Sequence, residues 1–222
     1  PIYHILRIIP RKSNNDFLGI RVRKALEELG PIFVKFGQAI STRGDIFPRE
    51  VINELVKLQD QVPPFNPEES ISILEDTYKK PIGEVFKEFV REPLAAASVA
   101  QVHDAKLKTG EEVVVKILRP GVRKQIEKDL DLLYLLASGI DKYWKEGKRL
   151  RLMEVVSEFE KTLDKELDLM AEASNANQLK RNFHSSGMLY VPEVYWDYCW
   201  KNIMVMEKVV GVPISDIESL VK

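Results

Sequence analysis

Length, composition and charge already exclude several classes of protein. The chain has 222 residues, 45% of them hydrophobic and 30% charged, which is typical of one large or two small globular domains. With 33 Lys and Arg against 34 Asp and Glu, the formal net charge is −1, so overall charge does not favour nucleic acid as a partner. The single cysteine, Cys199, excludes an internal disulfide, and the three histidines lie too far apart to predict a metal site.

The first third of the sequence is predicted to be helical. Apolar residues recur at helical spacing over Phe17–Leu29, and Pro31 is well placed as the first residue of a second helix. A third helix is expected from about Pro48. A fourth begins after the capping residue Asn66, and a short one covers 83–89. Residues 1–92 are therefore predicted to form an all-helical extension.

The pattern changes at Pro93, where small residues and β-branched runs begin. The expected elements are strands over 99–107 and 112–118, a helix over 120–144, a long helix over 152–183, strand-like pieces over 190–198 and 203–210, and a last helix from about Ser215. An antiparallel sheet with helices gathered to one side is an α+β arrangement, so residues 93–222 are predicted to form an α+β domain.

Lys116 lies inside the apolar strand Glu112–Leu118, across one hairpin from the alanine-rich segment Ala95–Ser98. A lysine in a strand often points to water at a sheet edge, and four small residues often form a plain turn. Phosphate groups, however, require both a cation and a backbone that approaches closely, and this arrangement can supply both. Alanine in place of glycine would make such a loop stiffer.

Two further polar pairs lie on predicted helices. Lys35 and Gln38 are three residues apart and share a helix face, with Gly37 allowing a close approach. Glu166 and Asp168 form a second pair in a highly charged helix. Each pair taken alone is more often solvated surface than a functional site.

Together, the K-x-G-Q motif, the alanine-rich segment, the strand lysine and the E-x-D motif resemble the UbiB/ADCK family of atypical kinase-like proteins. The similarity runs from about Leu18 to Ile217, and residues 190–195 and 204–211 resemble its bacterial UbiB branch. The resemblance implies a protein-kinase-like N-lobe after the helical extension. It also implies an ATP-binding, kinase-like or ATPase-like protein that supports ubiquinone biosynthesis.

The resemblance assigns roles to individual residues. Lys116 would bind the ATP phosphates and pair with Glu166, residues 206–210 would form the adenine-binding hinge, and Lys35 with Gln38 would face Glu166 and Asp168. The implied nucleotide-binding residues are Leu94, Ala95, Ala96, Ala97, Ser98, Val99, Ala100, Gln101, Val102, Lys116, Glu166 and Glu207.

The sequence departs from a complete kinase in one respect. No H-x-D…N or D-F-G motif occurs in it, so the catalytic Asp and the Mg²⁺ ligands are expected beyond Lys222. This chain is therefore expected to be soluble and to show no ATP turnover. The full-length protein would associate with the cytoplasmic face of the bacterial inner membrane, with ubiquinone-pathway proteins or lipid intermediates as partners.

Two alternatives stay open at this point. One is a non-catalytic scaffold that docks ubiquinone-pathway enzymes or lipid and retains only a vestigial ATP site. The other is an ordinary kinase with protein substrates, against which the stiff alanine segment and a helix lying over the site both argue.

Overall fold

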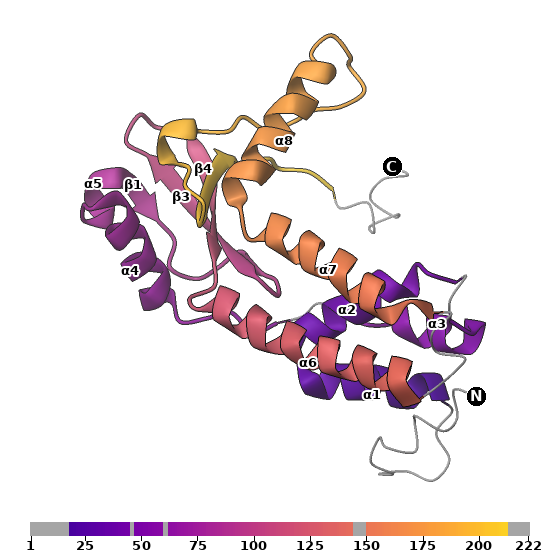
Figure 1. Cartoon of the computed structure of the whole chain (residues 1–222). Helices are drawn as coiled ribbons and strands as arrows, with labels where there is room; N and C mark the ends of the chain where they lie inside the picture. The colour runs from indigo at the N-terminus through magenta and orange to yellow at the C-terminus, as the bar shows by residue number, and fades with distance from the viewer. Residues whose placement is uncertain (1–17, 45–46, 60–61, 144–149, 213–222) are drawn as a thin grey trace. The chain divides into compact units, whose positions relative to one another are not determined.

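The computed structural model describes residues 18–44, 47–59, 62–143 and 150–212 (Figure 1). Its contacts divide the chain into two compact units. Unit 1 comprises Pro1–Pro64, Ala96–Ala100 and Arg119–Leu167, and unit 2 comprises Phe65–Ala95, Gln101–Leu118 and Asp168–Lys222. The domain boundary expected between residues 92 and 93 lies inside unit 2. The two compact units therefore differ from the two domains expected from the sequence.

Unit 1 is built from helices. They are α1 (Leu18–Leu29), α2 (Pro31–Ser41), α3 (Arg49–Leu55), α6 (Val122–Tyr143) and α7 (Leu152–Glu166). Pro31 begins α2 as predicted, because its fixed φ and missing N–H suit a first helical position. A core of Val34, Ile40, Val51, Leu55 and Leu58 joins α2 to α3 and to the segment that follows it.

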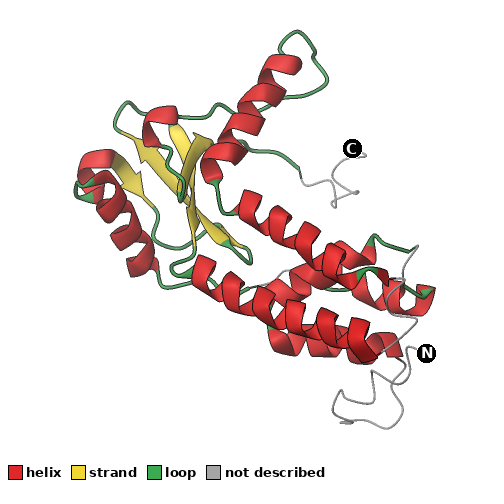
Figure 2. Ribbon diagram, viewed as in Figure 1, coloured by secondary structure: helices red, strands yellow, loops and turns green. Residues whose placement is uncertain are grey.

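Unit 2 contains an antiparallel sheet, drawn in yellow in Figure 2, with helices against it. Its strands are β1 (Phe86–Phe89), β3 (Ala100–Leu107), β4 (Glu112–Leu118) and β5 (Ile203–Glu207), in the order β1-β3-β4-β5. The short strand β2 (Ala95–Ala96) also pairs with β3. The remaining elements are α4 (Pro67–Tyr78), α5 (Ile82–Val85), α8 (Leu169–Asn182) and the 3₁₀ helix Trp196–Tyr198. The α+β class predicted from the sequence is confirmed.

The two faces of the sheet differ in chemistry because side chains alternate along a strand. On β4, Val113, Val115 and Ile117 belong to the main core, together with Leu74 of α4. The alternate residues Val114 and Lys116 therefore point to the opposite face of the sheet. That second face, called the lysine face below, carries the predicted phosphate-binding lysine.

Several predicted elements were wrong in detail. Residues 86–89, expected within a helix, form β1, which pairs with β3. The segment 190–198 makes only an isolated bridge at Val194 and the 3₁₀ helix. The helix predicted from Ser215 and the end of the one predicted over 120–144 lie outside the described residues.

The long helix predicted over 152–183 is two helices, α7 and α8. Asp168 explains the break. Its Oδ1 accepts hydrogen bonds from the backbone N–H groups of Met170 and Ala171, each at 3.1 Å. These donors would otherwise be unsatisfied at a new helix N-terminus, so the aspartate favours a fresh start there over a continuous helix.

Candidate functional site

Lys116 and Glu172 form a two-pronged ion pair within unit 2. The Lys116 Nζ atom lies 2.6 Å from Oε1 and 2.8 Å from Oε2 of Glu172. The lysine side chain is 24% exposed and the glutamate side chain 42%. A half-buried ammonium group needs a partner to offset its lost hydration, and the carboxylate provides one.

The start of α8 is attached to the sheet, and this brings Glu172 to Lys116. The backbone N–H of Leu169 donates to the carbonyl of Lys201 at 3.0 Å, next to the beginning of β5. Leu169 itself is fully buried. Glu172 lies in the first turn of α8, where the partial positive charge of a helix N-terminus stabilises a carboxylate.

Apolar side chains flank Lys116 on the lysine face. In the β4–β5 register, Lys116 lies opposite Met204 and Val114 lies opposite Met206. Val102 of β3 shares this face, because its neighbours Gln101 and His103 belong to the other one. Val102 and Met206 are partly exposed, whereas Val114 and Met204 are buried. Asp104 of β3 also lies on this face and pairs with Lys208 at 2.9 Å. The lysine face thus combines ion-paired cations with apolar surface, which suits a ligand that has a flat apolar part and an anionic part.

The pairing predicted between Lys116 and Glu166 was wrong. Glu166 lies in unit 1 at the last position of α7, and its partner is Lys35 of α2, with 2.9 Å between Nζ and Oε2. The chain turns between Glu166 and Asp168, so the carboxylate that meets Lys116 comes from the next helix. The N-capping aspartate four residues before Glu172 was the sequence signal that could have identified it.

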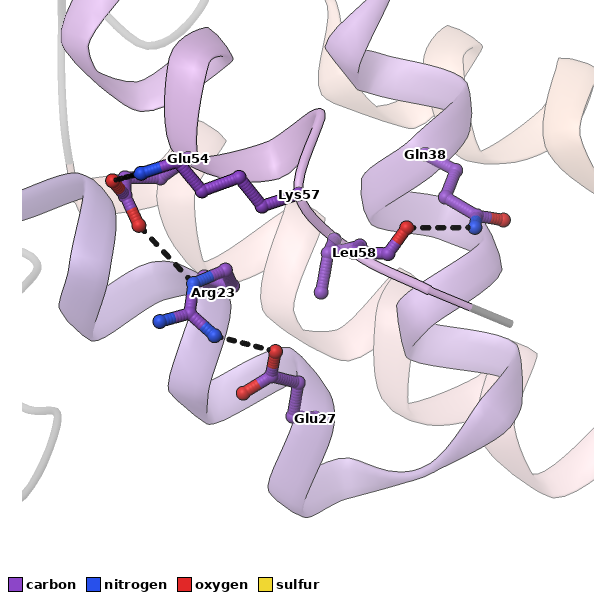
Figure 3. A network of polar contacts seen from close by, with 6 residues as sticks. All are labelled: Arg23, Glu27, Gln38, Glu54, Lys57 and Leu58. Atoms are coloured by element: carbon purple, nitrogen blue, oxygen red, sulfur yellow. Dashed lines mark hydrogen bonds and ion pairs between the residues drawn. The ribbon is translucent and has the colours of Figure 1, made fainter. Parts of the chain in front are cut away.

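The expected contact of Lys35 with the E-x-D motif is therefore confirmed for Glu166. Gln38 makes a different contact, because its Nε2 donates to the carbonyl of Leu58 at 3.1 Å, as Figure 3 shows. A Cβ atom added at Gly37 would come within 2.4 Å of a Leu58 methyl group. The group that approaches Gly37 closely is thus part of the core of unit 1, and the K-x-G-Q motif joins α2 to Leu58 as well as to α7.

The same region of unit 1 contains a second set of charges, also drawn in Figure 3. The Arg23 guanidinium contacts Glu27 at 2.6 Å and Glu54 at 3.1 Å, and Lys57 also contacts Glu54. These bonds hold the pKa of the Glu54 carboxyl below its usual value, with the bond from Lys57 as the main cause. They join α1 to α3 and include none of the residues predicted for the site.

The alanine-rich segment is held by backbone hydrogen bonds. Leu94 N donates to Val102 O at 2.8 Å, and Ala97 N donates to Ala100 O at 2.8 Å. Arg119 binds the carbonyl of Ala97 through Nε at 2.9 Å. Ser98 is buried, and its hydroxyl has no hydrogen-bond partner among the described residues.

Gln101 departs from the role predicted for it. Its side chain is fully buried on the core face of β3 and is bonded to Ser70, His103 and the backbone of Phe65. The strand alternation that places Val102 on the lysine face directs Gln101 away from it. A side-chain contact between Gln101 and a ligand on the lysine face is therefore excluded.

Glu207, the hinge residue predicted to bind nucleotide, lies at the end of β5. Its carboxylate accepts hydrogen bonds from the Tyr190 hydroxyl at 2.5 Å and from the backbone N–H of Glu193 at 3.0 Å. These bonds lower the pKa of Glu207, with the Tyr190 bond as the largest cause, and the same bond raises the pKa of Tyr190. The backbone N–H of Glu207 also donates to the carbonyl of Glu193 at 2.8 Å, so both the side chain and the N–H are engaged within the protein.

Two kinds of feature are absent from the described ranges. No group of three or more His, Cys, Asp or Glu side chains there is arranged to hold a metal ion. No helix in those ranges combines the length and apolarity needed to cross a bilayer.

The fold and the paired strand lysine define a kinase-like class of protein, and comparison with known proteins supports it. The chain is similar to a Mycobacterium tuberculosis structure titled "The complex structure of Rv3197-erythromycin", with a TM-score of 0.59 and 25% identity. The superposition covers 87% of this chain and 50% of the other one. Residues 57–222 match the ABC1 atypical kinase-like domain, and the chain belongs to that family.

Bacterial relatives match over nearly the whole chain. It is 52% identical to a "Probable protein kinase UbiB" of Azotobacter vinelandii over 97% of its length, and 52% identical to one of Marinobacter nauticus over 96%. It spans only 40% and 38% of those two relatives.

Proposed function

We propose that the protein of which this chain forms part binds ATP on the lysine face and acts as a kinase-like or ATPase-like factor in ubiquinone biosynthesis. The observation that carries the proposal is the Lys116–Glu172 pair on a partly apolar sheet face. An ammonium group has three N–H donors. Two point at the Glu172 oxygens, so a third can bind a phosphate oxygen while Glu172 holds the lysine in place.

The other parts of the proposal follow from family membership. We propose that the adenine lies along residues 206–210, against Val114 and Met206, and that residues 94–102 approach the phosphates through their backbone. Bound Mg²⁺ would neutralise charge on the phosphates, and its acidic ligands are proposed to lie in the portion of the relatives that this chain does not span. Association with the inner membrane and with ubiquinone-pathway proteins or lipids belongs to the same proposal.

The test is ligand-linked stabilisation of the full-length protein. A ligand that binds only the folded state at about 100 times its dissociation constant adds roughly 2.7 kcal/mol to the free energy of unfolding, so Mg-ATP should raise the melting temperature. Lys116→Ala should abolish most of that rise. Lys108→Ala, which removes an exposed lysine in the β3–β4 turn, should leave it unchanged.

Two outcomes would contradict the proposal. If Mg-ATP produced no rise in the unsubstituted protein, the scaffold alternative with a vestigial site would be favoured. If the rise were the same in Lys116→Ala and Lys108→Ala, the nucleotide would bind somewhere other than the lysine face.

A further inference from the structure

Three polar side chains lie fully buried on the core face of unit 2. They are Ser70 of α4 and Gln101 and His103 of β3, each with 0% exposure. Buried polar groups are costly unless all their hydrogen-bonding atoms are satisfied, and a satisfied network fixes the geometry of the segments that it joins. These three residues are called the buried triad below.

Gln101 uses both ends of its amide. Its Oε1 accepts from the backbone N–H of Phe65 at 3.1 Å. Its Nε2 contacts Ser70 Oγ at 2.7 Å and His103 Nε2 at 2.9 Å. One side chain therefore joins β3 both to α4 and to Phe65, the residue before the N-cap of that helix.

His103 extends the network to the other side. Its Nδ1 lies 3.0 Å from the carbonyl oxygen of Val90, the residue after β1. A carbonyl can only accept, so Nδ1 carries the proton and Nε2 accepts from Gln101. The ring also stacks on Phe89, with 4.9 Å between centroids. Burial lowers the pKa of His103, which favours this neutral form.

Gln101 and His103 flank Val102, the residue of β3 whose side chain lies on the lysine face. Val102 lies between Gln101 and His103, so fixing these two fixes Val102 between them. The carbonyl of Val102 accepts from Leu94 N at 2.8 Å, and Val90 N donates to Asp104 O at 2.9 Å. The segment between Val90 and Leu94 is therefore hydrogen-bonded to β3 at both ends. The buried triad contacts one of these ends directly, through the bond between His103 and Val90.

We propose that Gln101 and His103 are positioning residues for nucleotide binding, which hold Val102 and the Leu94 backbone in register with Lys116 from the opposite side of the sheet. This inference rests on the proposed function and adds to it a set of residues that do not touch the ligand. A purely structural role would predict only lost stability when the triad is broken. A positioning role predicts an additional loss of nucleotide affinity.

The test compares two full-length variants with destabilised cores. Gln101→Met keeps the volume but removes the amide, whereas Val85→Ala shortens an apolar side chain of the same core. At a temperature where both remain folded, the dissociation constant for Mg-ADP should rise about tenfold in Gln101→Met and stay within about twofold in Val85→Ala. Equal affinities in the two variants would overturn the inference.

A second pair of variants covers the case in which Gln101→Met does not fold. In His103→Asn the amide N–H can replace Nδ1–H toward Val90, whereas His103→Leu has no donor. Affinity should be better retained in His103→Asn, and equal losses in both would contradict the positioning role. Lys116→Ala in the same titration distinguishes the positioning role from the proposed function. Unchanged affinity in Lys116→Ala would contradict the proposed function itself.

Discussion

The pairs Lys116–Glu172 and Lys35–Glu166 are similar in distance and exposure but differ in setting. Lys116–Glu172 joins a strand to the first turn of a helix in unit 2, whereas Lys35–Glu166 joins two helices in unit 1. Glu172 lies at a helix N-terminus, which stabilises a carboxylate, and Glu166 lies at a helix C-terminus, which destabilises one. The first carboxylate is therefore stabilised without its lysine, and the second depends on it.

Under the proposed function, this difference separates a pair that binds a ligand from a pair that stabilises the fold. Because Glu172 has the helix N-terminus as a second source of stabilisation, Lys116 can share its charge with an incoming phosphate at little cost. If Lys35 shared its charge in this way, Glu166 would lose the cation that offsets its unfavourable position. We therefore expect substitutions in the first pair to change nucleotide affinity and substitutions in the second to change stability.

The largest effect on nucleotide affinity is expected from removing the charge of Glu172. Glu172→Gln should weaken Mg-ATP binding by tenfold or more, since a bond to a charged partner contributes about 1.5 to 3 kcal/mol and Lys116 would lose its fixed position. Glu166→Gln is the matched control and should bind nucleotide like the unsubstituted protein. Isothermal titration of both full-length variants checks this, and the reverse pattern would mean that Glu166 is the functional partner after all.

The N-cap of α8 should give the next largest effect. Asp168→Ala removes the acceptor for two backbone N–H groups and should lower the free energy of unfolding by about 1 kcal/mol. Asp168→Asn retains a side-chain oxygen and should lose much less. Chemical denaturation measures both changes. If the two variants were equally stable, the cap would not be what separates α7 from α8.

A smaller effect on stability and nucleotide affinity is expected at the alanine-rich segment. None of the bonds described above joins the side chains of either Lys–Glu pair to this segment. Ala96→Gly should lower stability by roughly 0.5 to 1 kcal/mol through backbone entropy and should alter the relative affinities for ATP and ADP. Nucleotide titrations that overlay those of the unsubstituted protein would remove residues 94–102 from the proposed site.

The sequence predicted much of this architecture because its strongest signals are local. Pro31 and the cap at Asn66 each mark a helix start, and the β-branched run in β4 marks a strand. The errors arose where one residue type serves two purposes. In the sequence, Asp168 resembles one more charged residue of a polar helix, but in the structure it caps the new helix α8. Phe86 fits a helical pattern, but it belongs to strand β1.

The site was harder to predict, because spacing along the chain does not specify which carboxylate meets which lysine. Glu166 and Glu172 both lie in the same charged stretch, and only the turn at Asp168 assigns them to different units. Gln101 was misplaced for a related reason. In a strand, one step in sequence moves a side chain to the other face of the sheet.

The smallest expected effect concerns the pair in unit 1. Surface ion pairs contribute little, typically 0.2 to 1 kcal/mol, because exposed charges are well hydrated and screened by salt. Lys35–Glu166 is partly exposed, but the position of Glu166 at the end of α7 should raise the cost of removing the lysine alone. Lys35→Ala should therefore be more destabilising in the presence of Glu166 than in a Glu166→Ala background.

A double-mutant cycle in chemical denaturation should give a coupling energy of about 0.5 kcal/mol between Lys35 and Glu166. The coupling should decrease as salt concentration rises, since it is electrostatic. Lys165→Ala with Glu166→Ala serves as a control, because adjacent helix positions do not face each other and their effects should add. Additive effects for Lys35 and Glu166 at low salt would show that the pair contributes nothing to the fold. The contrast between a supporting pair and a ligand-binding pair would then fail.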